Sequence, residues 1–269
     1  MTRFGLKRLV TVNAEENIMN TNKNSYTLIY MVVIITIVSL LLSITSGSLR
    51  SFQEDNVRLD TKKQILNSLP GIELGEDAAA TYAATIKEYN MLDAEGNVIK
   101  TLDPVADFDV KATEGVEFPM YVAEVNGETK YILPMNGAGL WGAIWGYMAL
   151  NDDRNTVYGV FFNHAGETPG LGAEIVTEKF RNPFIGKELL KDGKFASIAI
   201  EKPGTKVEGR DQVDAISGGT ITSKGVEAML ATSLVNYEKF LTAPAAIVVE
   251  EVIEAVADSV MVEPTDSIN

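Results

Sequence analysis

The chain has 269 residues, 46% of them hydrophobic, and its 23 Lys plus Arg against 37 Asp plus Glu give a formal net charge of −14. A chain with this charge repels polyanions, which excludes nucleic acid as a partner. The lack of cysteine excludes disulfides, thiolate-ligated iron–sulfur clusters and cysteinyl flavins, and the single histidine, His164, excludes a multi-histidine metal site. Redox chemistry in this chain therefore needs an organic cofactor.

Residues 26–44 (YTLIYMVVIITIVSLLLSI) contain no charged side chain. A helix needs roughly 20 such residues to cross a membrane. The polar leader of residues 1–25 is longer than the usual n-region of a signal peptide, so we expect a retained transmembrane helix over residues 26–44. Lys and Arg are equal in number on both sides of it and leave its orientation undecided: Arg3, Lys7, Arg8 and Lys23 precede it, and Arg50, Arg58, Lys62 and Lys63 follow.

Beyond the span, the pattern predicts a juxtamembrane helix over residues 50–67 and a short helix over residues 77–89. Residues 90–100 predict a β-hairpin, because a turn sequence at residues 93–96 separates apolar pairs. Four further strands are expected, at residues 121–125, 131–133, 157–162 and 196–200.

The clearest helix is expected over residues 223–241, because apolar side chains recur there at spacings of three and four. These side chains are Val226, Met229, Leu230, Leu234, Tyr237 and Leu241. Short strands mixed with few helices predict an α+β class: one transmembrane helix followed by a mixed α/β domain over residues 50–242. Residues 243–269 carry six acids without Lys or Arg and predict a disordered acidic tail.

The first segment that could carry chemistry is D-A-I-S-G-G-T-I-T-S, residues 214–223, immediately before this helix. Two adjacent glycines allow close approach of the backbone to a bulky group, and a helix N-terminus favours an anion. The hydroxyls of Thr220 and Thr222 lie at the same end, so a bound or esterified phosphate would be stabilised there. An ordinary glycine turn leading to a helix cap explains the same residues.

Two further segments stand out. H-A-G-E-T-P-G-L-G, residues 164–172, follows a predicted strand; taken alone, it is a surface loop whose acid is solvated. G-A-G-L-W-G-A-I-W-G-Y-M-A-L, residues 137–150, places two tryptophans among small residues, which core packing alone also explains.

These three segments, in this order after one span, resemble the FMN-binding flavoprotein family that includes the C subunit of the bacterial sodium-translocating NADH:quinone reductase and the G subunit of the Rnf complex. S-G-G-T resembles the family's S-G-A-T signature, in which a flavin transferase joins FMN through its phosphate to the threonine. The resemblance implies covalent FMN on Thr220, recognition through Asp214, and contacts of Ser217, Gly218, Gly219 and Thr222 with the cofactor. Gly219 replaces the usual alanine.

The resemblance also implies that Glu167 and Thr168 face polar edges of the flavin, that Leu171 and Gly172 contact its ring, and that Leu140 and Trp141 wall one side. His164 receives no role. By the same resemblance the chain is a single-pass protein of the bacterial inner membrane, with residues 1–25 cytoplasmic and the domain periplasmic. The resemblance further implies that it relays electrons among the other subunits of a respiratory complex, and we expect it to be inactive alone.

The length of the leader and the form G-A-G-L-W-G favour the branch of the sodium-translocating reductase over the Rnf branch. Two alternatives remain: an Rnf-type subunit with the same flavin chemistry, and a membrane-tethered module whose S-G-G-T loop binds a free anion or flavin without a redox role.

Overall fold

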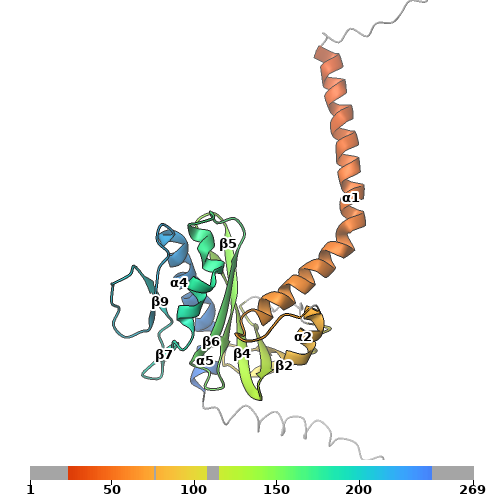
Figure 1. Ribbon diagram of the computed structural model, residues 1–269. Coiled ribbons are helices and arrows are strands. Elements are labelled where there is room, and N and C mark those ends of the chain that lie inside the picture. The colour runs from red at the N-terminus through yellow and green to blue at the C-terminus, as the bar shows by residue number, and fades with distance from the viewer. Residues whose placement is uncertain (1–23, 76, 108–114, 244–269) are drawn as a thin grey trace, which may run out of the picture. The chain divides into compact units, whose positions relative to one another are not determined.

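The computed structural model describes residues 24–75, 77–107 and 115–243 (Figure 1). The chain divides into two compact units, residues 1–55 and 56–269. The described part of the first unit is helical and belongs to α1 (Asn24–Leu66). An 18-residue window of α1 has a mean hydropathy of 2.7 with no residue buried, so the predicted apolar spanning helix is confirmed by length and composition. The juxtamembrane helix expected at residues 50–67 is the continuation of α1 rather than a separate element.

The second unit is built on a six-stranded antiparallel sheet of order β2-β1-β3-β4-β5-β6. The strands are β1 (Ile86–Leu92), β2 (Val98–Leu102), β3 (Phe118–Val125), β4 (Glu128–Ala138), β5 (Ala143–Leu150) and β6 (Val157–His164). Neighbouring residues of a strand point to opposite faces, so both faces are buried: Leu133 packs in one core cluster and Ile132 in the other. Figure 1 shows helix α4 on one side of this sheet and helix α2 on the other.

Helix α2 (Ala78–Thr85) begins at Asp77, whose Oδ1 accepts hydrogen bonds from the N–H groups of Ala79 and Ala80, both at 3.0 Å. The predicted end of this helix at residue 89 is wrong. From Ile86 the backbone is extended and pairs with β3, because that pairing places Ile86 and Tyr89 in the core. The hairpin predicted at residues 90–100 is confirmed.

Strand β5 was not predicted, because its glycines and tryptophan obscure the alternation of a strand. Ile144, Gly146 and Met148 are buried, while Trp145 and Tyr147 between them are partly exposed. The strand expected at residues 196–200 begins only at β9 (Ala199–Glu201), since Ser197 has a left-handed backbone with φ of 59°. The other strands predicted between residues 121 and 162 are confirmed.

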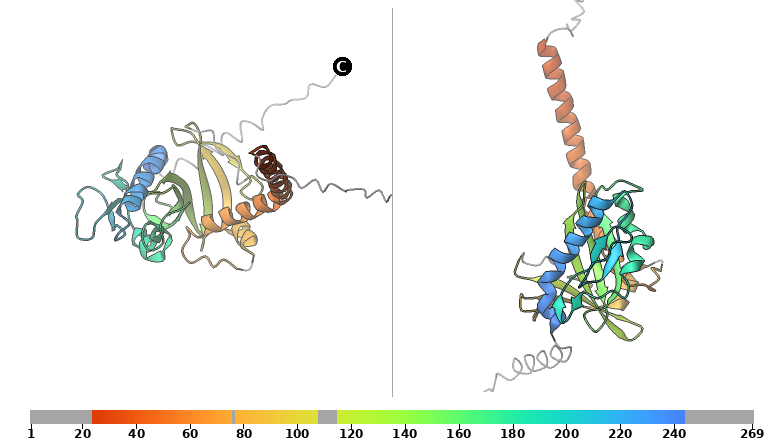
Figure 2. Two further views of the ribbon diagram at one scale, coloured as in Figure 1. Left: turned by 90° about the horizontal axis from the view of Figure 1, so that it is seen from above. Right: turned by 90° about the vertical axis from the view of Figure 1, so that its left-hand side faces the viewer.

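Helix α4 (Thr220–Leu234) leads through a 3-10 turn, η3 (Val235–Tyr237), into α5 (Glu238–Thr242). The predicted start at residue 223 is three residues late. All six side chains predicted to share its inner face are buried, at 3% exposure or less. The views of Figure 2 show α4 lying against the sheet.

A second, parallel pairing joins β9 to β10 (Gln212–Asp214) beside α4. Between β6 and β9 the chain forms η1 (Gly172–Val176), α3 (Glu178–Arg181), η2 (Asn182–Phe184), β7 (Leu190–Lys191) and β8 (Lys194–Phe195). The α+β class is thus confirmed. Apart from residues 24, 25 and 243, the predicted leader and acidic tail lie outside the described residues.

Candidate functional site

A cavity of about 400 Å³ opens where the three chemistry-bearing segments meet. The β4–β5 hairpin, the loop after β6 and the first turn of α4 form its walls. The lining residues are Leu140, Trp141, Glu167, Thr168, Leu171, Gly172, Gly218, Gly219, Thr220, Ile221 and Thr222. Segments about 80 residues apart in the sequence therefore build one site.

The acceptor loop, residues 214–220, connects β10 to α4. Gly218 has a φ of 77°, a left-handed conformation that glycine adopts without strain. Ser223, fully buried, secures both ends of the loop: its Oγ accepts from the N–H of Ile216 at 3.0 Å and donates to the carbonyl of Gly219 at 2.9 Å. Thr220 follows as the exposed first residue of α4, so its hydroxyl is presented at a helix N-terminus.

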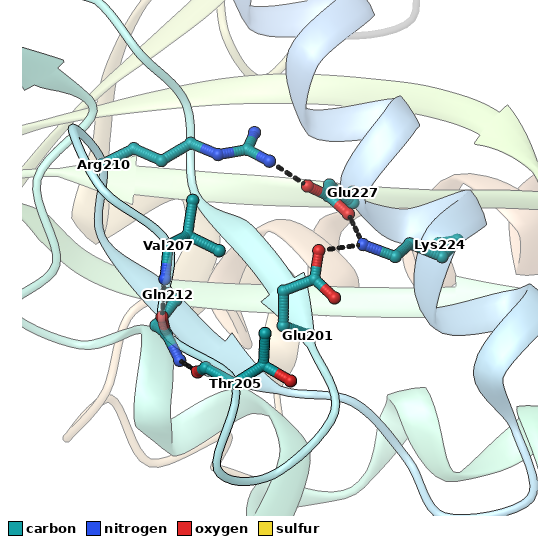
Figure 3. Close-up of polar contacts among 7 residues, drawn as sticks. All are labelled: Glu201, Thr205, Val207, Arg210, Gln212, Lys224 and Glu227. Atoms are coloured by element: carbon teal, nitrogen blue, oxygen red, sulfur yellow. Dashed lines mark hydrogen bonds and ion pairs between the residues drawn. The ribbon is translucent and has the colours of Figure 1, made fainter.

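Ion pairs attach β9 and the segment that leads into β10 to α4 (Figure 3). Glu227 of α4 binds Arg210 at 2.6 Å and Lys224 at 2.6 Å, and Lys224 also binds Glu201 of β9 at 2.6 Å. The Glu227 side chain is only 12% exposed, so solvent screens its pairs less than those of the fully exposed surface. β9, β10 and α4 are therefore held together beside the acceptor loop.

Glu167 lies at the base of the cavity and is 5% exposed. One carboxylate oxygen, Oε1, accepts from the N–H of Trp141 at 2.8 Å, and Oε2 accepts from the hydroxyl of Thr222 at 2.6 Å. Burial alone raises the pKa of a carboxyl group. The hydrogen bonds from the hydroxyl of Thr222 and the N–H of Trp141, with smaller contributions from the nearby Leu140 and His164, outweigh it, so the pKa of Glu167 lies below its usual value. Glu167 is thus a buried, ionised group rather than the solvated acid of a surface loop.

The hairpin between β4 and β5 supplies the apolar wall. The N–H of Gly139 donates to the carbonyl of Gly142 at 2.8 Å, which closes a tight turn with Leu140 and Trp141 at its tip. Leu140 is 47% exposed and Trp141 70%. Trp145 lies four residues along β5, outside the cavity lining, and its indole N–H donates to Gln64 of α1 at 2.9 Å.

All the residues expected at the cofactor line this cavity except Ser217. Ser217 and Asp214 line a neighbouring groove of about 510 Å³ together with Glu174 and Lys179. His164 lies outside the lining, and its Nδ1 accepts from the N–H of Glu167 at 3.2 Å.

Ile221, Ser223 and Gly139 were missed from the sequence. Ile221, 61% exposed, could have been found from the helix start, since the residue after Thr220 shares its first turn. Gly139 and Ser223 act through contacts that no local pattern reveals.

The residues fit a flavin mononucleotide. The cavity volume falls in the range of about 300–1,000 Å³ typical of small-molecule sites. Its rim is apolar, with Leu140, Trp141, Leu171 and Ile221 suited to a ring, and its far wall is a helix N-terminus suited to a phosphate. Within residues 24–75, 77–107 and 115–243 there is no group of three or more metal-ligating side chains.

An apolar N-terminal helix followed by such a domain defines a membrane-anchored FMN-binding protein. The family model of the FMN-binding domain matches residues 139–235, which include the segments at residues 164–172 and 214–223 and all but the first two residues of the segment at residues 137–150. The C subunit of the Na⁺-translocating NADH-quinone reductase of Haemophilus ducreyi is 30% identical over 77% of this chain and 88% of the relative. The crystal structure of the same subunit from Parabacteroides distasonis shares 47% identity and a TM-score of 0.68, over 73% of this chain and 98% of that one.

A crystal structure of NqrC from Shewanella oneidensis is 26% identical with a TM-score of 0.56, over 69% of this chain and 97% of that one. The chain belongs to the family formed by the C subunits of Na⁺-translocating NADH-quinone reductases. It is accordingly a membrane flavoprotein and a subunit of an oxidoreductase complex.

Proposed function

We propose that this chain carries electrons within a Na⁺-translocating NADH:quinone reductase through FMN joined by a phosphoester to Oγ1 of Thr220. The observation that supports the attachment most directly is the position of Thr220, exposed on the first turn of α4 and at the wall of the cavity. The resemblance of S-G-G-T to the family's signature points to the same hydroxyl.

The helix N-terminus suits the phosphate of the ester. The first N–H groups of an α-helix lack partners within the helix, and its dipole is positive at that end. Those of α4 begin at Thr220, so a phosphate on this side chain receives backbone hydrogen bonds without any basic side chain in the described lining.

The apolar rim suits the ring. Leu140 and Trp141 come from one side and Leu171 from the other, while Thr168 offers a hydroxyl to a polar edge of the ring. FMN supplies the one-electron chemistry when it is bound, and the chain supplies position, exclusion of water and electrostatics. The other subunits of the complex provide the electron donor and acceptor.

A flavin transferase is the partner for maturation in this proposal. Asp214 and Ser217 are exposed and line the groove beside the cavity, so an enzyme can contact them while Thr220 receives the FMN group. Gly219 has no side chain to obstruct the site, and the Cβ of the usual alanine would lie against Ile216 and the backbone of Leu171.

We further propose that α1 anchors the domain on the periplasmic face of the inner membrane. The chain has no cysteine, so single cysteines report sidedness without background. A Lys100→Cys variant should react with a membrane-impermeant maleimide in cells with a permeable outer membrane, whereas Asn13→Cys in the leader should react only after lysis. The reverse labelling pattern would place the domain in the cytoplasm.

The relay role is tested in membranes that contain the whole complex. Thr220→Ala should abolish NADH-driven quinone reduction, with the complex still assembled, because the electron path through this subunit is interrupted. Full quinone reduction by the assembled variant complex would refute the role. A wild-type protein that stays colourless beside an active transferase would instead favour the anion-binding alternative.

A further inference from the structure

Glu167 touches every wall of the flavin cavity. It belongs to the loop after β6, its Oε1 binds the hairpin through the N–H of Trp141 at 2.8 Å, and its Oε2 binds α4 through the hydroxyl of Thr222 at 2.6 Å. The backbone of Leu140, beside Trp141 in the hairpin, also helps to lower the pKa of this carboxylate. The side chain that donates from α4, Thr222, is 1% exposed.

Two glycines make room for this carboxylate. A Cβ at Gly139 would overlap Oε1 of Glu167, and a Cβ at Gly172 would overlap both Oε2 of Glu167 and Oγ1 of Thr222. The carboxylate is therefore enclosed by the same three segments that it joins, and it cannot shift toward either glycine.

The enclosure gives the carboxylate an electrostatic role as well. Among the described residues that line the cavity, Glu167 is the one with a charged side chain. Water and salt screen a buried charge weakly, so its field acts on whatever occupies the cavity. Its hydrogen bonds come from groups without net charge, the N–H of Trp141 and the hydroxyl of Thr222.

We propose that Glu167 is a positioning residue that joins the hairpin, the loop and α4 around the flavin, and that its negative charge lowers the flavin's reduction potential. The second half of this inference rests on the proposed function, and the first half does not. Reduction adds negative charge to the flavin, and a fixed carboxylate nearby opposes that addition.

Two variants separate position from charge. In Glu167→Gln the amide oxygen still accepts from the N–H of Trp141, and the amide nitrogen donates to the hydroxyl of Thr222, so the connections remain while the charge is lost. In Glu167→Ala both are lost, and the N–H of Trp141 and the hydroxyl of Thr222 lose their partner. Glu178→Gln is the matched control: it removes one negative charge from an exposed helix position outside the cavity lining.

The positioning role is tested on the flavin-free full-length protein in detergent. Amide hydrogen exchange at Leu140 and Trp141 should be about tenfold or more faster in Glu167→Ala than in the wild type, and close to wild type in Glu167→Gln and Glu178→Gln. Unchanged exchange in a folded Glu167→Ala protein would overturn the positioning role, whether or not the chain binds flavin.

The electrostatic role is tested by redox titration of the flavin-loaded protein. The midpoint potential should move to a more positive value in Glu167→Gln and remain unchanged in Glu178→Gln. An unchanged potential in Glu167→Gln, or an equal shift in both variants, would overturn it. If the wild-type chain takes up no flavin, the proposed function fails first, and the exchange experiment still decides the positioning role.

Discussion

The two halves of the acceptor loop face different cavities. Asp214 and Ser217 are exposed in the groove beside Glu174 and Lys179, and the structure assigns neither side chain a hydrogen bond within the described residues. Gly218 and Gly219 line the flavin cavity, where the loop continues into Thr220 and α4. The first half is exposed to solvent in the groove, whereas the second half is part of the proposed cofactor site.

In the proposed function, this division would let one short signature serve two purposes. Residues recognised by a modifying enzyme need to be accessible and need not support the fold, while residues around the bound group need defined positions. Substitutions in the first half should therefore affect the attachment of flavin, and substitutions in the second half should affect the cofactor site itself.

The largest effect is expected at Thr220. Thr220→Ala should remove covalent flavin completely, because the acceptor oxygen is lost, while Thr220→Ser should retain it. The side chain is exposed, so the free energy of unfolding of both variants should lie within about 0.5 kcal/mol of the wild-type value. In-gel flavin fluorescence after denaturation measures attachment, and circular dichroism on heating measures folding. Covalent flavin in the alanine variant would contradict the attachment site.

A smaller but clear effect is expected in the other half of the loop. Asp214→Ala should slow attachment of flavin without lowering stability, because the carboxylate faces the groove and supports nothing in the fold. The measurement is a time course with purified transferase at equal concentrations of folded protein. Glu178→Ala, at another exposed acid, is the control. Equal rates for all three proteins would remove Asp214 from recognition.

Gly172→Val should act on the structure of the cavity. Its side chain would meet the carboxylate of Glu167 and the hydroxyl of Thr222, so we expect a loss of about 1–3 kcal/mol in the free energy of unfolding and a changed flavin fluorescence. The ester itself should still form. Chemical denaturation of the flavin-free protein measures this loss. A Gly172→Val protein as stable as the wild type would contradict the prediction, because it would show that the cavity accommodates the larger side chain.

Glu227→Gln should lower the free energy of unfolding by about 1–2 kcal/mol, less than Gly172→Val. The substitution weakens ion pairs with Arg210 and Lys224, and these pairs are only partly buried. Attachment should be reduced only as far as the acceptor loop loses its support. Because salt screens these ion pairs, high salt should reduce the difference in free energy of unfolding between the variant and the wild type, as measured by chemical denaturation. A difference that does not depend on salt would point to packing rather than charge.

The smallest effect is expected for Gly219→Ala, which restores the residue usual in the signature. An added Cβ would lie 3.0 Å from Cγ2 of Ile216 and 3.1 Å from the carbonyl oxygen of Leu171. The backbone φ of −109° is open to alanine, so the entropic gain and the tight contact should nearly cancel, within about 1 kcal/mol. Denaturation and the rate of attachment should both stay close to wild type.

The sequence predicted the parts of this molecule that depend on local pattern. The uncharged run in α1, the hairpin turn before β2 and the inner face of α4 follow from length, turn residues and helical spacing. Strand β5 escaped because Gly146 accommodates Phe161 and Phe162 of the neighbouring strand, so its sequence shows small residues where a strand usually shows large ones.

The sequence predicted which residues line the cavity but not the hydrogen bonds that join them. Its residues were named from three separate segments, yet the burial of Glu167 was missed because an acid on a loop is normally solvated. Its partners, Trp141 and Thr222, lie 26 and 55 residues away in the chain, and only the folded structure brings their donors together.

The central claim is that Thr220 bears FMN, and the most direct test is the mass of the intact chain after expression with a flavin transferase. The account predicts an increase of about 438 Da, the mass of FMN less one water, located by peptide mapping on Thr220. An unmodified mass beside a modified control substrate, or the same increase on Thr222 or another residue, would contradict it.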